Sequence, residues 1–192
     1  QVAAGLRRVM LGLERPADGE LAAMGKHGCG PQVSRRALEL FRPYDEVYTI
    51  ASMIFGTPDE SPESIRRLLA GAGCADATVF LPLTPNPGTA EWRRARREGT
   101  LATEDFSQYN FLNPVVQSGR YDQRAMIRLY GRTVLRYTLR SARSWLARWP
   151  RRTNRRKLGL ALRLGWRAAR IGARAWLTGR PTRDRRPSWY ES

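Results

Sequence analysis

Apolar residues follow two different periodicities along this chain. Three short runs rich in apolar and β-branched residues stand at 9–13, 49–55 and 77–83, and turn-forming or acidic residues close each of them. Such runs are typical of strands that are buried on both faces. Elsewhere apolar residues recur every three or four positions, which is typical of helices that pack by one side. The predicted helices cover residues 18–24, 32–41, 62–72, 90–98, 123–149 and 155–177.

Strand and helix alternate three times, which favours an α/β fold with parallel strands and crossover helices. The signals are clearest around residues 49–64, where an apolar run breaks at Gly56 and a helix restarts with Ser61 as N-cap and Pro62 at its first position. Three strands alone leave an unpaired sheet edge, so we expect that a preceding half of the α/β fold is missing from this sequence. The absence of a starting methionine at Gln1 fits the same expectation. The predicted parts are an α/β unit over 1–112, a linker over 113–122, basic amphipathic helices over 123–178 and a disordered end over 179–192.

Charge is distributed very unevenly over these parts. Residues 1–112 carry 13 Lys and Arg against 14 Asp and Glu, a balance of −1, whereas residues 113–192 carry 21 against 3, a balance of +18, which together give the net +17. A near-neutral folded unit is therefore followed by a basic segment whose partner should be anionic.

Cysteine and histidine are too few to define a site. Two cysteines, Cys29 and Cys74, do not form a disulfide framework and suggest a reducing compartment, and with His27 they have no metal-ligand spacing. The chain shows neither a signal peptide nor an apolar run long enough to span a bilayer. These observations predict a cytoplasmic protein.

Residues suited to ligand binding follow each predicted strand. Glu14 follows the first, Gly56 and Glu60 follow the second, and Pro85 and Gly88 follow the third. Taken singly, Glu14 suits a solvated acid better than a ligand, and the glycine and proline residues fit ordinary turns. Because parallel strands end at the same edge of a sheet, their coincidence predicts one shared ligand mouth.

Three of these segments also resemble a known family. VMLGLE (9–14), MIFGTPDES (53–61) and FLPLTPNPGTAEW (80–92) are similar to the later strands of a radical S-adenosylmethionine barrel, and most of all to its cobalamin-binding type. That type includes anaerobic magnesium-protoporphyrin ester cyclases and radical enzymes of hopanoid metabolism. The resemblance implies that residues 1–112 are the later half of a partial (β/α) barrel. The positions that correspond to the family's cofactor-binding residues are Glu14, Ser52 (where the family has glycine), Ile54, Gly56, Asp59 or its neighbour Glu60, Thr84, Pro85 and Gly88, with Pro87 and Thr89 in the same turn.

The resemblance implies S-adenosylmethionine and a 4Fe–4S cluster as cofactors of a full-length parent, with cobalamin as a further option. It also implies radical chemistry on a lipid-soluble or tetrapyrrole-like substrate. The CxxxCxxC motif that holds the cluster is absent from these 192 residues, so we expect this chain alone to be inactive. In the connecting loop, Tyr109 and Asn110 are candidates for approaching the substrate, although surface packing suits both residues better.

The basic helices leave two interpretations open. In the predicted helix over 155–177, Arg163, Arg167, Arg170 and Arg174 form one stripe, and leucine and tryptophan occupy much of the rest. This pattern suits a helix lying on an anionic membrane surface at the inner face, and it equally suits packing against the rest of the protein. Nucleic acid fits less well, because the apolar face is too wide. The two hypotheses for function are therefore part of a radical S-adenosylmethionine enzyme, or a non-catalytic α/β unit whose tail binds a membrane surface.

Overall fold

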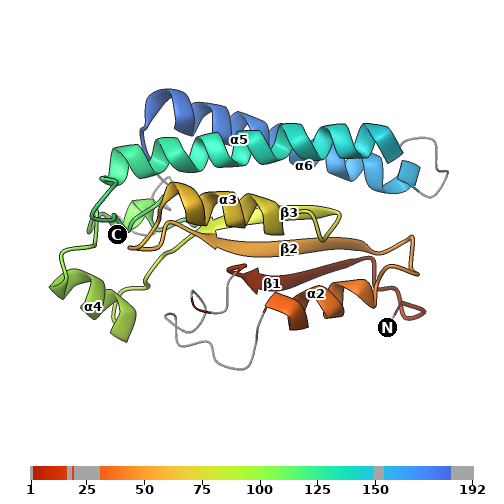
Figure 1. The fold of residues 1–192 in the computed structure, drawn as a ribbon, viewed down its shortest axis with the longest axis horizontal. Coiled ribbons are helices and arrows are strands. Elements are labelled where there is room, and N and C mark those ends of the chain that lie inside the picture. The colour runs from red at the N-terminus through yellow and green to blue at the C-terminus, as the bar shows by residue number, and fades with distance from the viewer. Residues whose placement is uncertain (1, 17–18, 20–30, 149–153, 183–192) are drawn as a thin grey trace, which may run out of the picture.

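The computed structural model describes residues 2–16, 19, 31–148 and 154–182. Its elements are, in order, β1 (Arg8–Glu14), α2 (Pro31–Glu39), β2 (Tyr48–Phe55), α3 (Pro62–Gly71), β3 (Ala77–Pro82), α4 (Ala90–Arg97), the short 3-10 helix η1 (Phe106–Gln108), α5 (Gln123–Arg148) and α6 (Asn154–Thr178) (Figure 1). The three strands begin and end within one residue of the bounds expected from the sequence. The helix expected over 18–24, together with His27 and Cys29, lies outside the described residues.

The strands form one parallel sheet in the order β1-β2-β3. The alternation of strand and helix and the parallel pairing that the sequence predicts are both confirmed. The sheet is open, and the described residues show no closed barrel. At the helix that follows β2, Ser61 is the N-cap: its hydroxyl accepts a hydrogen bond from Ser64 N, and the Ser64 hydroxyl accepts one from Ser61 N.

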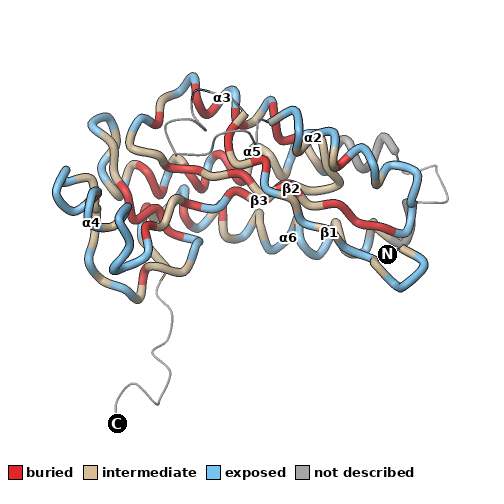
Figure 2. Tube along the Cα trace, turned by 90° about the horizontal axis from the view of Figure 1, so that it is seen from below, coloured by how far each residue is buried: buried red, intermediate tan, exposed pale blue. Residues whose placement is uncertain are grey.

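One face of the sheet is covered and the other is open. The covered face packs against α2, α3 and α5 through a cluster of buried side chains, which includes Leu13, Leu38, Ala51, Met53, Phe55, Leu68, Phe80, Met126 and Tyr130. The alternate residues point the other way, and there Met10 and Leu81 are exposed while Ser52 and Ile54 are partly exposed. In Figure 2 the buried segments run lengthwise through the molecule, and β1 lies along an exposed border. The open face is thus a surface on which a ligand or another polypeptide segment can lie.

Helices α5 and α6 form a close hairpin beside the sheet (Figure 1). They cross at Gly131 and Gly172, where a Cβ atom on Gly131 would collide with the backbone of Trp176 and Gly172. On α5, Ile127, Tyr130 and Val134 are buried, and six arginines on its other side are exposed: Arg124, Arg128, Arg132, Arg136, Arg140 and Arg143.

The segments before and after this hairpin pack on each other. In the expected linker, Val115 and Val116 are buried, and Ala102 N donates to Val115 O at 2.9 Å. Residues 179–182 belong to the end for which we expected disorder, yet Thr182 N donates to Asn113 Oδ1 at 2.8 Å and Asn113 Nδ2 donates to Thr182 O at 2.6 Å. These bonds connect the end of α6 to the loop before α5.

Tyr130 connects α5 to the sheet, and its ionisation should change the free energy of unfolding with pH. Its buried hydroxyl donates to Phe80 O at 3.0 Å, and its ring meets Phe55 edge-on. Burial raises the pKa of Tyr130 to about 12, above the value of about 10 for an unfolded chain. The fold favours the neutral phenol, so this contribution is complete below about pH 10 and is lost as the pH rises towards 12.

We therefore expect Tyr130→Phe to lower the free energy of unfolding at neutral pH by about 1 kcal/mol, through the lost hydrogen bond. We also expect the variant to lose less stability than the wild type between pH 10 and 12, the interval between the unfolded value and the raised pKa. Urea unfolding followed by circular dichroism at a series of pH values measures both effects. Identical pH profiles for the two proteins would contradict the assignment.

Candidate functional site

The carboxyl ends of the strands meet at one edge of the sheet. Glu14 at the end of β1 is in register with Met53, and Phe55 at the end of β2 is in register with Pro82 at the end of β3. Glu14 and Gly56 therefore lie on neighbouring strand ends, as predicted. Gly88 belongs to the loop that leads from β3 to α4 and lies further from the sheet edge along the chain.

Glu14 is held in an unusual conformation over the open face. The register between β1 and β2 shifts between Gly12 and Glu14, which makes a bulge at Leu13. Glu14 has a φ of 59°, a left-handed conformation that is uncommon for a residue with a side chain. A Cβ atom on Gly12 would collide with the carboxylate of Glu14, so glycine at position 12 leaves the space that the carboxylate occupies. A larger side chain at position 12 would push the carboxylate of Glu14 aside.

Two further predicted residues share this face with the Glu14 carboxylate. Ser52 is paired with Gly12 on one side and with Val79 on the other, and Ile54 is paired with Leu81. The structure therefore brings Glu14, Ser52 and Ile54 together. The result is a carboxylate and a hydroxyl beside a mainly apolar, partly exposed sheet surface.

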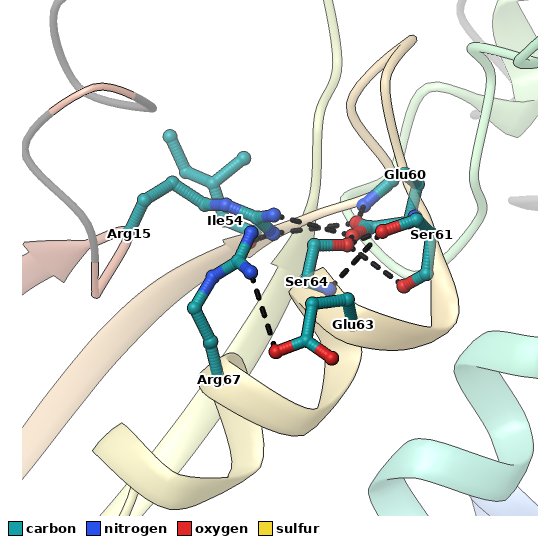
Figure 3. A network of polar contacts seen from close by, with 8 residues as sticks. Arg15, Ile54, Glu60, Ser61, Glu63, Ser64 and Arg67 are labelled. Carbon is teal, nitrogen blue, oxygen red and sulfur yellow. Dashed lines mark hydrogen bonds and ion pairs between the residues drawn. The ribbon is translucent and has the colours of Figure 1, made fainter.

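Glu60 has a different role from the predicted one. Its side chain is completely buried, and its oxygens accept hydrogen bonds from Gly56 N at 2.7 Å, from the Ser64 hydroxyl and from the guanidinium group of Arg15 (Figure 3). The assignment of Glu60 to a cofactor is therefore corrected, because a carboxylate enclosed in this way holds the protein itself together.

Arg15 is the partner that the sequence analysis missed. It is almost fully buried, and it donates to both oxygens of Glu60 at 3.3 and 3.2 Å and to Ile54 O at 3.0 Å. It follows Glu14 directly, so the network connects the end of β1 to the end of β2 and fixes the strand ends that form the site. A buried carboxylate needs a cation, but the sequence around Glu60 does not show that it is buried, so no local signal pointed to Arg15.

The glycine and aspartate in the loop after β2 divide between packing and exposure. Gly56 has a φ of 77° and is buried close to Met126 and Pro114. Its amide donates a hydrogen bond to the carboxylate of Glu60. Asp59 is exposed. Gly56 therefore shapes the turn, while Asp59 is the acid of this loop that solvent reaches.

The turn after β3 is built by its own hydrogen bonds. The Thr84 hydroxyl donates to Pro82 O at 3.0 Å, Pro85 is buried, and Thr89 caps α4 by accepting from Trp92 N at 3.2 Å. Gly88 has a φ of 84°, and nothing would lie within 4 Å of a Cβ atom there. The glycine is thus explained by its backbone conformation, and its surroundings are open.

Tyr109 and Asn110 are engaged in the loop that contains them. The Tyr109 hydroxyl donates to Thr103 O at 2.9 Å, and Asn110 Nδ2 donates to Thr182 O at 3.4 Å. Burial raises the pKa of Tyr109. Both side chains serve loop packing, which is the role that suited them better on the sequence.

The described residues do not fit an iron–sulfur cluster. They include no group of three or more His, Cys, Asp or Glu side chains that could hold a metal ion. Cys74 is half-buried, its thiol donates to Gly71 O at 3.3 Å, and burial raises its pKa, so it is a poor thiolate donor.

Comparison with known proteins finds one distant relative. No family model matches the chain. An uncharacterized methyltransferase, PH0819, from Pyrococcus horikoshii is 27% identical over 138 residues, which are 71% of this chain and 30% of that protein. The chain thus spans less than a third of the length of the relative.

Proposed function

We propose that the open face of the sheet binds the nucleoside part of S-adenosylmethionine and that this chain is part of a methyltransferase. The observation that carries the proposal is the Glu14 carboxylate, which a bulge and a side-chain-free Gly12 place over the open face beside Ser52. The distant likeness to a methyltransferase supports the same cofactor. S-adenosylmethionine, when bound, supplies an activated methyl group on a sulfonium centre.

The residues of the open face would share the work of holding this cofactor. A carboxylate such as that of Glu14 accepts hydrogen bonds from ribose hydroxyls or from the ammonium group of the methionine part. The hydroxyl of Ser52 is a second polar contact, and Ile54 offers an apolar surface to the adenine ring. The left-handed backbone of Glu14 sets the direction in which its side chain leaves the strand.

The proposal includes an acceptor that is lipid-soluble or tetrapyrrole-like, in keeping with the family that the sequence resembles. Exposed Met10 and Leu81 on the same face support an apolar acceptor. We derive no radical step, because the described residues do not fit the iron–sulfur cluster, and we assign no residue to cobalamin.

A binding measurement on matched variants tests the proposal. We expect radiolabelled S-adenosylmethionine to bind the wild-type chain in equilibrium dialysis, and Glu14→Gln to bind at least about tenfold more weakly, since a hydrogen bond to a charged group contributes about 1.5–3 kcal/mol. Gly12→Ala should weaken binding similarly, because its methyl group displaces the carboxylate.

Glu104→Gln is the matched control. Glu104 is an exposed acid paired with Arg96 at 2.9 Å, outside the sheet, and its loss should leave binding unchanged. Urea unfolding is used to check that all three variants are folded. Equal binding by Glu14→Gln and the wild type, or no binding by either, would refute the assignment of the open face.

A further inference from the structure

Large apolar side chains are exposed along the outer side of α6. Leu162 is 60% exposed, Trp166 is 68% exposed and Leu177 is 71% exposed. With Ala169 and Ala173 they form a row at spacings of four, three, four and four residues, which places all five on one side of the helix. We call these five residues the apolar row of α6.

The apolar row lies between the contact with α5 and a row of arginines. Gly165 and Gly172 face α5, and each is followed by a member of the apolar row, Trp166 or Ala173. The next residue in each case is an arginine. The arginine row of α6 consists of Arg163, Arg167, Arg170 and Arg174, all exposed.

The fourth side of α6 turns inward. Ala168 packs against the core cluster, Ala175 is buried, and Lys157 donates to Asp76 at 3.0 Å. The helix is therefore anchored from the inside. Its apolar row and its arginine row remain turned to solvent, side by side.

Neither α5 nor α6 contains an acidic residue. The sequence has no Asp or Glu from residue 123 to residue 183. Within the part of the chain that the structure describes, none of the four guanidinium groups in the arginine row pairs with a carboxylate. On α5, exposed Arg128, Arg132 and Arg136 add a second basic row along the neighbouring helix.

We propose that this outer face of the α5–α6 hairpin docks flat on an anionic lipid bilayer. Leucine and tryptophan are the side chains that enter the boundary between headgroups and acyl chains, and arginines beside them meet the lipid phosphates. Each arginine near such a surface adds about a fivefold gain in binding. No helix among the described residues is long and apolar enough to cross a membrane, so the helix lies along the surface.

A bilayer explains both rows at once, whereas nucleic acid explains one. Phosphate groups of DNA or RNA would satisfy the arginine row. The apolar row would then stay in water, because most of the contacts that hold a protein on a duplex are polar. The surface is also separate from the open sheet face, so this inference is independent of the proposed cofactor site.

Vesicle sedimentation with the whole chain tests the proposal. We expect the chain to sediment with vesicles of phosphatidylglycerol and phosphatidylcholine, to remain soluble with phosphatidylcholine alone, and to dissociate as salt is raised. Exchange of the four arginines of the arginine row for glutamine should weaken binding at least tenfold. Exchange of Leu162 and Trp166 for serine should weaken it by a similar factor.

Two matched controls separate this surface from net charge and general hydrophobicity. Arg36, Arg42, Arg94 and Arg97 are exposed elsewhere, and their exchange for glutamine removes the same charge. Val33 and Leu40 are exposed at 59% and 69%, and their exchange for serine removes comparable apolar surface. Both controls should bind anionic vesicles within about twofold of the wild type, because the charge effect falls off within a Debye length.

Three outcomes would overturn the proposal. One is equal sedimentation with neutral and anionic vesicles. The second is equal weakening by the control exchanges and by the exchanges in α6. The third is binding of duplex DNA or RNA that survives the Leu162 and Trp166 exchange while vesicle binding is absent, which would assign the surface to nucleic acid.

Discussion

Arg15→Met is expected to lower the free energy of unfolding by about 3–5 kcal/mol, the usual cost of removing one partner of a buried ion pair. Glu60 would remain enclosed with the amide of Gly56 and the hydroxyl of Ser64, but without its cation. The carbonyl of Ile54 would also lose the donor that reaches it at 3.0 Å. Urea unfolding followed by circular dichroism measures the loss.

Arg67→Met is the matched control for this experiment. Arg67 pairs with Glu63 at 3.5 Å on the exposed side of α3, with side chains 42% and 55% exposed. An exposed pair of this kind contributes about 0.2–1 kcal/mol. Comparable losses for Arg15→Met and Arg67→Met would show that the buried pair does not hold the strand ends together.

A double variant measures the coupling free energy between Arg15 and Glu60. With Arg15→Met and Glu60→Gln together, no charge is left buried, so we expect a loss smaller than the sum of the two single losses by more than about 1 kcal/mol. The four unfolding free energies give this coupling directly. Strictly additive losses would mean that Arg15 and Glu60 act separately.

Local patterns predicted the fold well because they are set by neighbouring residues. A buried parallel strand reads as an apolar run whichever strand it pairs with, so β1, β2 and β3 stand within one residue of their expected bounds. The capping residues of α3 act in the same local way. The open face of the sheet was harder to predict, because segments that are distant in the chain decide whether a face is covered.

The candidate site was predicted in part for a related reason. Glu14 and Gly56 stand at strand ends, and parallel strands must end at the same edge. Burial of a carboxylate cannot be recognised from its own neighbours: Glu60 and Asp59 are adjacent, yet one is buried and the other exposed. The difference comes from Arg15, which lies in a different loop.

The tail shows the same division between local and distant effects. Helical spacing predicted the extent of α5 and α6 and the exposed arginines. It could not choose between packing on the protein and lying on a membrane. The structure shows that α6 packs by its inner side and leaves its outer side exposed, and the exposed side is the one for which we propose a membrane.

The close crossing of α5 and α6 predicts a second large effect. Gly131→Ala should lower the free energy of unfolding by about 3 kcal/mol, because its methyl group would collide with backbone atoms of Trp176 and Gly172 that cannot rotate away. The helices would have to move apart, and the contacts of α6 with the core would be weakened. Urea unfolding measures the loss of stability. A larger increase in hydrogen exchange over the wild type for amides of α6 than for amides of the sheet would show that the loss arises at α6.

Gly159→Ala, also in α6, is the control for this prediction, because it should change the stability in the opposite direction. Gly159 is exposed and nothing would lie within 4 Å of a Cβ atom there. Alanine is a better helix former than glycine by about 1 kcal/mol, so this variant should be more stable than the wild type. Both substitutions add the same methyl group to a helical glycine, and the crossing is the difference between them. If Gly131→Ala also stabilised the chain, α5 and α6 would not pack at Gly131, and the solvent-facing side of α6 would have to be assigned anew.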